Sequence, residues 1–187
     1  MKEKEFMRTF ALSIAVGLVA VSAVGQGTVN FANVGVGLNA PYFFMDGVTR
    51  LAGPEFLAQL YVGSAASESA LTAVPGPAPF LTGTGAGYFN GGTRSLPGFA
   101  PGSRLFFQVR IWAAVGGNSY DEALATGRFS LKSTVFQIGM NLGDPVGPPQ
   151  TPPATLLGLT SASLVPEPST IALGILGAAA LLFRRRK

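Results

Sequence analysis

The chain of 187 residues contains neither cysteine nor histidine. Without cysteine no disulfide can form, so a folded domain must depend on its hydrophobic core and its hydrogen bonds. The lack of histidine removes the usual proton shuttle at neutral pH and the commonest metal ligand. The residue inventory therefore excludes Ser-His-Asp triads, Cys-His pairs and zinc sites built on these ligands, and no metal or other cofactor is expected.

The central part of the chain also lacks a net charge. The full sequence has a formal charge of +4 at pH 7, yet residues 26–164 hold six basic and six acidic residues. The positive excess lies in the first 25 residues and in the last segment. Because nucleic-acid binding needs Lys and Arg gathered on the folded domain itself, no nucleic-acid partner is expected.

Catalytic and nucleotide-binding motifs are missing as well. Asp121 and Glu122 are the only adjacent acids in residues 26–164, and neighbouring side chains on a helix or strand point in different directions. The glycine-rich stretch Gly83–Gly87 has neither the G-x-G-x-x-G spacing nor a following Lys-Ser or Lys-Thr. We identify no catalytic residue and expect a protein that is not an enzyme; a hydrolase is the least favoured hypothesis.

The first 25 residues have the order of parts of a secretory signal peptide. Arg8 supplies positive charge, an apolar run extends from Phe10 to Ala23, and small residues follow. Cleavage after Gly25 or after Ala23 fits this pattern, and translation starts at Met1 or, because the residues before it are acidic, at Met7. The alternative, a buried first helix, is disfavoured because the segment has no polar face.

Residues 165–187 contain three parts in sequence. Val165-Pro166-Glu167-Pro168 comes first, an apolar run from Ile171 to Phe183 follows, and Arg184, Arg185, Arg186 and Lys187 complete the segment. As a helix the apolar run would span about 20 Å, short of the ~30 Å hydrocarbon core of a membrane. The cations resist translocation, and the prolines favour an extended backbone around Glu167. We expect a transient inner-membrane anchor with an accessible processing site.

This three-part pattern resembles the PEP-CTERM sorting signal. The resemblance implies an exported protein of a Gram-negative-type bacterium that makes exopolysaccharide. It also implies a partner, the exosortase, an integral-membrane protease or transpeptidase that recognises and cleaves the tail. The expected location is the cell surface, the outer envelope or the extracellular biofilm matrix, with exopolysaccharide as a further partner. A plain membrane anchor without processing is the alternative.

Residues 26–164 are expected to form one all-β domain, a β-sandwich of jelly-roll type between the signal helix and the short C-terminal apolar helix. The clearest element is Ser103–Val115, in which side chains alternate with a period of two. Leu105, Phe107 and Val109 fall on one face, and Phe106 and Trp112 fall on the other. This pattern predicts a central strand.

The other expected elements follow from turn signals and apolar runs. Asp46-Gly47 and Asn90-Gly91 are favoured two-residue hairpin turns, Ser119–Gly127 has the pattern of a short helix, and residues 145–153 read as a proline-rich loop. Further strands are expected at 27–34, 55–62, 126–131, 134–139 and 155–164.

Trp112 and Phe106 are the one feature of this domain that suggests a ligand. An exposed aromatic face on a β-sandwich can stack against sugar rings, so the second hypothesis is a carbohydrate-binding module that uses these two residues. The alternative is that the second sheet or a loop covers this face. The first hypothesis is a non-enzymatic exported protein with a structural or adhesive role in the cell surface or matrix.

Overall fold

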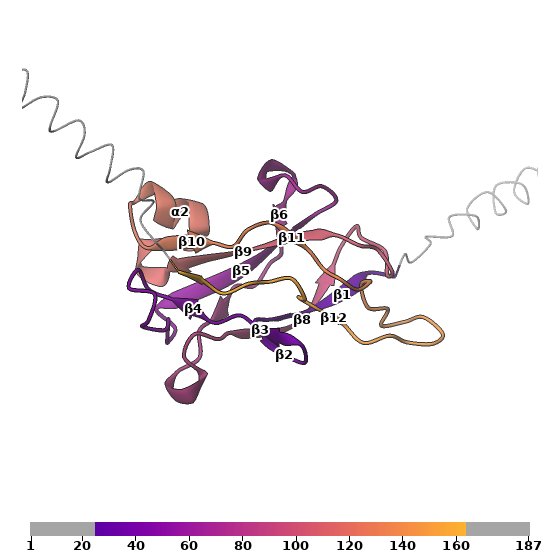
Figure 1. Ribbon diagram of the computed structural model, residues 1–187. Coiled ribbons are helices and arrows are strands. Elements are labelled where there is room, and N and C mark those ends of the chain that lie inside the picture. Colours follow the sequence, from indigo (N-terminus) through magenta and orange to yellow (C-terminus); the bar gives the residue numbers. More distant parts are fainter. Residues whose placement is uncertain (1–24, 164–187) are drawn as a thin grey trace, which may run out of the picture.

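The computed structural model describes residues 25–163, which fold into an all-β domain (Figure 1). Within this range the sole α-helix is α2 (Tyr120–Ala125), and the short 3₁₀ turns are η1 (Glu68–Ala70), η2 (Gly83–Gly85) and η3 (Ala114–Gly116). The all-β prediction is therefore confirmed. The predicted signal segment up to residue 24 and the sorting segment 165–187 lie outside the described residues.

The larger sheet is built on one long antiparallel pair. β5 (Phe56–Gly63) and β9 (Phe106–Ala113) are in register over eight residues, from Phe56 opposite Ala113 to Gly63 opposite Phe106. Around this pair lie β6 (Thr72–Ala73) and β7 (Ala78–Pro79) on β5, and β10 (Ser130–Lys132) and β11 (Phe136–Gln137) on β9. β9 thus has neighbours on both edges, which confirms the prediction of a central strand.

The smaller sheet has the order β12-β1-β8. β1 (Gly27–Ala32) pairs antiparallel with β8 (Asn90–Leu96) and parallel with β12 (Ala154–Thr155). Two short pairs complete the domain: β4 (Tyr42–Phe43) is parallel to β13 (Ala162–Ser163), and β2 (Val34–Gly35) is antiparallel to β3 (Leu38–Asn39).

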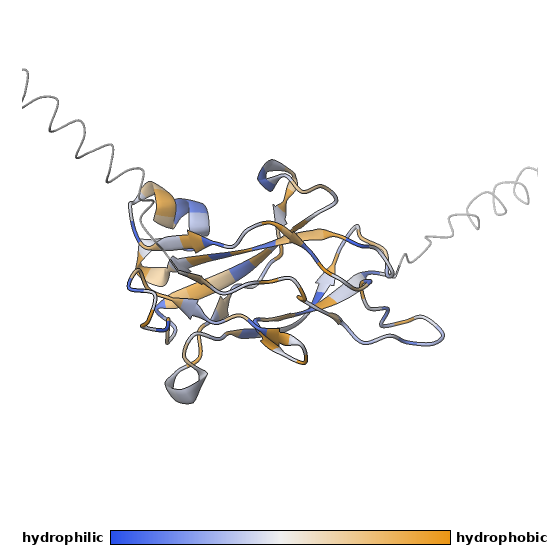
Figure 2. Cartoon of the chain, viewed as in Figure 1, coloured by the Kyte–Doolittle hydropathy of each residue, from blue (hydrophilic) through white to orange (hydrophobic). Residues whose placement is uncertain are grey.

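Both sheets contribute to one hydrophobic core. Val29 and Phe31 from β1 belong to the same buried cluster as Phe107, Val109 and Ile111 from β9, and all five are fully buried. Hydropathy colouring shows that β5 and β9 are mostly apolar, with single polar residues between the apolar ones (Figure 2). Burial of apolar surface between the sheets is the main stabilising contribution in this disulfide-free domain.

The hairpin predicted at Asn90-Gly91 is wrong. These residues begin strand β8, and the register between β1 and β8 shifts there, with Asn30 opposite Thr93 and Ala32 opposite Asn90. Gly92 has a φ of +70°, and its N–H donates to the Asn90 side chain. The Asn-Gly-Gly sequence therefore forms a β-bulge. A Cβ on Gly91 would lie 2.5 Å from the Phe31 ring, so this close approach requires glycine.

Three other predictions are refined. Asp46-Gly47 does lie in a turn, but four residues separate the paired Phe44 and Thr49. The helix is confirmed: Ser119 caps it by accepting the N–H of Glu122, and Gly127 follows it with a φ of +64°. The strand expected at 126–131 therefore begins only at Ser130. The strand expected at 155–164 is divided between β12 and β13, with Gly158 at a φ of +109° between them.

The described segment begins and ends at opposite ends of the domain (Figure 1). Gly25 lies beside Val146 and Pro101, near the proline-rich loop, whereas β13 pairs with β4. Within residues 25–163 no helix combines the length and the apolar character needed to cross a membrane.

Candidate functional site

The junction between the domain and the predicted sorting segment is formed by β4 and β13. Ala162 is opposite Tyr42, and Ser163 is opposite Phe43. Within the described residues β13 has no other strand partner. We call these two strands the exit junction, because the chain continues from Ser163 through Leu164 and Val165 to Pro166.

On its other side β4 is held firmly by its own turn. The Phe44 N–H donates to the Thr49 carbonyl at 2.8 Å, and the Leu51 N–H donates to the Tyr42 carbonyl at 3.1 Å. The Asp46 carboxylate accepts the Thr49 hydroxyl and two backbone N–H groups. These hydrogen bonds, that of the hydroxyl above all, lower the pKa of Asp46. A carboxylate with such partners is the usual way in which aspartate stabilises a turn.

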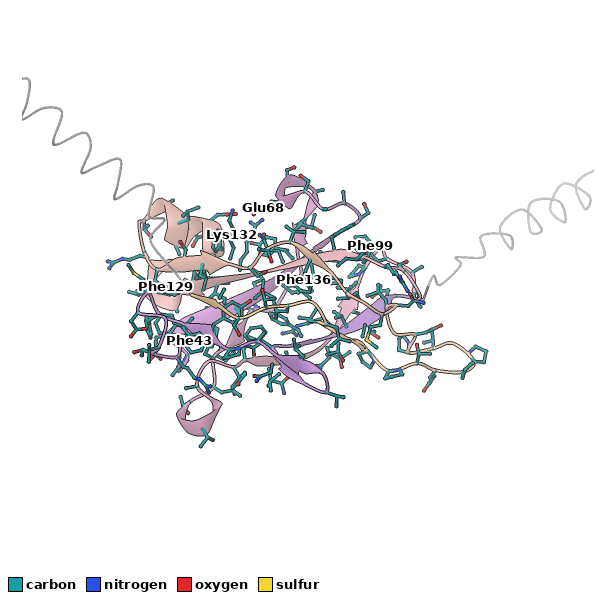
Figure 3. The ribbon with its side chains drawn as sticks, viewed as in Figure 1. Phe43, Glu68, Phe99, Phe129, Lys132 and Phe136 are labelled. Carbon is teal, nitrogen blue, oxygen red and sulfur yellow. The ribbon has the colours of Figure 1, made fainter. Side chains whose placement is uncertain are left out.

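Three phenylalanines anchor this turn to the larger sheet. Phe44 packs edge-on against Phe56 of β5, with ring centroids 5.1 Å apart. Phe129, just before β10, lies 5.8 Å from Phe44 and 5.4 Å from Phe56. Figure 3 shows Phe129 and Phe43 at the same end of the domain. Edge-to-face aromatic pairs stabilise beyond their buried area, so β4 is a fixed edge.

β13 has much weaker support. Leu156 and Leu159 are buried in the core, and the Leu159 N–H donates to the Leu156 carbonyl. Thr160 and Ser161 are exposed, and Ala162 is only partly buried against the core. Leu159 is therefore the last residue before the sorting segment that the core holds firmly.

The proposed sugar-binding role of Trp112 is not supported, because its side chain is fully buried. Trp112 packs with Tyr120 and Ala123 of the helix and with Leu57, and its Nε1–H donates to the Gly117 carbonyl at 3.0 Å. The helix, whose packing position the strand pattern does not reveal, covers the ring. No ring face is left for a sugar.

Phe106 is partly buried and lies at the other end of β9. Trp112 is six residue steps farther along the strand, which corresponds to about 20 Å. Phe106 is opposite Gly63 and Gln137 in the sheet, whereas Trp112 is opposite Leu57 and Ser130. The two aromatic residues therefore do not form one platform, although both are on the face that the alternation predicts.

Between them lies a polar network that sequence patterns did not indicate. The Arg110 guanidinium is 3.9 Å from the centroid of the Tyr61 ring and 5.5 Å from that of Tyr120. Its Nε donates to the Gln108 side chain at 2.9 Å, and its Nη1 lies 3.9 Å from the Asp121 carboxylate. These residues come from β5, β9 and α2, so only the tertiary structure brings them together.

The network continues to η1 and β10. Gln108, fully buried, donates to the Glu68 carboxylate and to the Ser133 carbonyl, both at 3.0 Å. Lys132 forms an ion pair with Glu68 at 2.6 Å, and Figure 3 shows the two side chains together above the sheet. The hydrogen bond from Lys132 is the main reason that the pKa of Glu68 is lowered. The polar groups thus satisfy one another within the chain.

Two other features of the domain offer little chemistry. A groove of about 580 Å³ lies beside the proline-rich loop, lined by Met140, Leu142, Asp144 and neighbouring residues of that loop. Among residues 25–163 no aromatic or basic side chain lines it. In the part of the chain that the structure describes, no group of three acidic residues could hold a metal ion.

Comparison with protein families gives one match. Residues 164–187 match the model described as the PEP-CTERM protein-sorting motif. The matched range begins one residue before the segment 165–187 that the sequence predicted. The comparisons with curated proteins and with solved structures found no match. The resemblance stated for Pro166-Glu167-Pro168, the apolar run and the terminal cations is thus confirmed, and the exit junction immediately precedes the motif.

Proposed function

We propose that this chain, an exported protein that carries a PEP-CTERM sorting motif and is sorted by an exosortase, is a non-enzymatic component of the cell surface or of the exopolysaccharide matrix. In this proposal the domain of residues 26–164 has a structural or adhesive role. The exosortase, a membrane enzyme, processes the tail after the signal peptide has directed export.

The observation that carries the proposal is the position of the motif. The match covers residues 164–187 and follows directly on the last strand of a folded all-β domain. The domain has no cysteine and therefore no disulfide, and its polar side chains around Arg110 are engaged with one another. Such a domain suits a protein that is displayed on the cell surface or embedded in the matrix better than it suits an enzyme.

Mass spectrometry of the protein from its native host tests the sorting step. We expect a mature form that lacks the residues before Gln26 and those after about Pro168. A Glu167→Ala variant should accumulate with its tail intact, whereas the matched Ser169→Ala variant should be processed as the wild type is. Intact Lys187 on wild-type protein from the soluble cytosolic fraction would contradict the proposal.

A second experiment tests the role in the matrix. The mature protein should cosediment with exopolysaccharide from the same host, and a strain that produces the Glu167→Ala variant should have less of it in the matrix fraction. Because the Trp112 ring is buried, retention by polysaccharide should not depend on stacking by this residue. Mature protein that remains entirely in the supernatant would refute the adhesive role.

A further inference from the structure

The exposed side chain of Arg50 lies against two aromatic rings. Its guanidinium carbon is 6.0 Å from the centroid of the Phe43 ring and 5.4 Å from that of the Tyr88 ring. Both distances are within the range of cation–π attraction. The Tyr88 hydroxyl donates to the Asn39 side chain at 2.7 Å. We call Asn39, Phe43, Arg50 and Tyr88 the Arg50 cluster.

The backbone places this cluster on the outside of the domain. Tyr42 and Phe44, which flank Phe43, both pack in the core, so Phe43 points away from it. Arg50 is the cross-strand partner of Phe43 and therefore shares its face. Arg50 is exposed and Tyr88 is half-buried. The cluster is thus open to solvent.

The segment beside Arg50 restrains its side chain. Nη1 of Arg50 donates to the Ala86 carbonyl at 3.4 Å. Gly87 has a φ of +88°, and a Cβ there would lie 3.1 Å from Cδ of Arg50. The Gly87 N–H donates to the Leu51 carbonyl, and its carbonyl accepts the Tyr42 N–H. A side chain that is restrained before a ligand arrives loses less entropy on binding.

Arg50 has no acidic partner among residues 25–163. The ion pairs in that range are formed by Arg110 and Lys132. Asp46, the acid closest to Arg50 in the sequence, accepts hydrogen bonds from its own turn. A guanidinium carries several N–H donors, and the hydrogen bond that Arg50 makes goes to a neutral carbonyl. The positive charge and the remaining donors are therefore available to an anionic ligand.

The chemistry of the cluster favours one class of anion. The fork of a guanidinium matches the two oxygens of a carboxylate. The aromatic rings beside it offer apolar faces against which the C–H face of a sugar ring can stack. A uronic acid unit supplies both features, because its carboxylate is attached directly to the sugar ring. A glutamate side chain instead carries its carboxylate on a flexible stem, which must lose rotamer freedom on binding.

We propose that the Arg50 cluster binds acidic polysaccharide: Arg50 pairs with the carboxylate of a uronic acid unit, and Phe43 and Tyr88 stack against the sugar rings. This proposal rests on the adhesive role proposed above and gives that role a site and a ligand class. The site lies on β4 and on the segment before β8. It does not involve β9, where a helix covers Trp112.

Titration calorimetry with defined oligomers tests the ligand class. The full chain, purified in a nonionic detergent, should bind a short oligogalacturonate, and the affinity should fall as salt is added. The methyl ester of this oligomer keeps the sugar rings but lacks the charge, and should bind at least about tenfold more weakly. A glutamate oligopeptide of the same charge should also bind more weakly. Equal affinity for the ester or for the peptide would overturn the proposal.

Variants of the arginine test the site. Arg50→Gln should lower the affinity for oligogalacturonate by at least about tenfold, because it removes a charge-assisted pair. Arg50→Lys keeps the charge without the fork and should lose most of this affinity. Arg128→Gln removes another exposed arginine and is the matched control, which should bind as the wild type does. Wild-type affinity in either Arg50 variant would contradict recognition by the guanidinium.

Variants of the rings test the stacking. Phe43→Leu and Tyr88→Leu should each weaken binding several-fold, because they replace an aromatic face with an aliphatic side chain. Tyr88→Phe keeps the ring but loses the hydrogen bond to Asn39, and should bind nearly as well as the wild type. Far-UV circular dichroism checks that each variant is folded. Full affinity in both leucine variants would refute contact with a sugar ring.

Cosedimentation with host exopolysaccharide separates this proposal from the adhesive role. The Arg50→Gln variant should be retained less than the wild type. Equal retention of the two, or retention of a wild type that does not bind oligogalacturonate, would overturn the assignment to the Arg50 cluster and leave the adhesive role intact. A wild type that binds oligogalacturonate but stays in the supernatant would support the site and contradict the adhesive role.

Discussion

The two faces of β9 are both buried, but by different means. On the inner face Phe107, Val109 and Ile111 pack against the smaller sheet in an apolar core. On the outer face Gln108 and Trp112 are equally buried, yet each is held by hydrogen bonds to η1, to the segment after β10 or to the loop before α2. An aromatic residue on the second face of a sheet is therefore no evidence of an exposed binding platform.

The largest effect is expected on the inner face. Phe107→Ala removes a fully buried ring between the sheets and should lower the free energy of unfolding by about 3–5 kcal/mol, because truncation of a core phenylalanine leaves a cavity. Urea unfolding followed by far-UV circular dichroism measures this. The matched Phe106→Ala variant changes a partly buried neighbour on the outer face. It should lower the free energy of unfolding clearly less than Phe107→Ala does. Equal losses would mean that the two faces do not differ as described.

An intermediate effect is expected for the buried hydrogen bond on the outer face. Trp112→Phe keeps an aromatic ring under α2 but leaves the Gly117 carbonyl without the indole donor. The free energy of unfolding should fall by about 2 kcal/mol, the cost of leaving a buried acceptor unpaired. The same unfolding measurement applies, since the signal does not depend on tryptophan. A change below about 0.5 kcal/mol would place the indole N–H in contact with solvent.

The smallest effect is expected at the exposed edge of the outer face. Glu68→Gln breaks the ion pair with Lys132, in which both side chains are nearly half exposed. It should lower the free energy of unfolding by less than about 1 kcal/mol. The lowered pKa of Glu68 means that the unfolded chain binds a proton there more readily than the folded one. This stabilisation is therefore present above the unfolded pKa of about 4.3 and is lost as the pH falls through the lowered folded value.

A pH series of unfolding experiments tests this sign. The difference in the free energy of unfolding between the wild type and the Glu68→Gln variant should be largest near pH 7 and should shrink below about pH 4. Glu55→Gln, at an exposed acid just before β5, is the matched control. A difference that grows as the pH falls would exclude a stabilising role for the ionised Glu68.

Much of the fold could be predicted from short-range patterns. The alternation along Ser103–Val115 predicted β9 and its two faces, and the pattern of Ser119–Gly127 predicted the short helix α2. Asn90-Gly91 was misread because the same residues that favour a tight turn also favour a glycine-rich bulge. The deciding contact, the Phe31 ring against Gly91, lies sixty residues away in the sequence.

The candidate site, too, could be predicted only in part from the sequence. The sorting motif is a linear signal, and Pro166, Glu167, Pro168 and the cations after residue 183 can be recognised without a fold. The pairing of the residues just before the motif could not be predicted in this way, because β13 pairs with β4, which lies more than a hundred residues earlier in the chain. No pattern in residues 155–164 separates one continuous strand from two short ones in different sheets.

By itself the sequence determined that this protein is exported and sorted, that its domain is all-β, and that it cannot use cysteine or histidine chemistry, since composition and linear motifs carry that information. Only the tertiary structure decided that Trp112 lies under a helix, that Arg110 is enclosed by two tyrosines, and that two paired residues stand between the core and the sorting motif. The physical reason is that burial and pairing depend on contacts between segments far apart in the chain, and such contacts leave no local pattern.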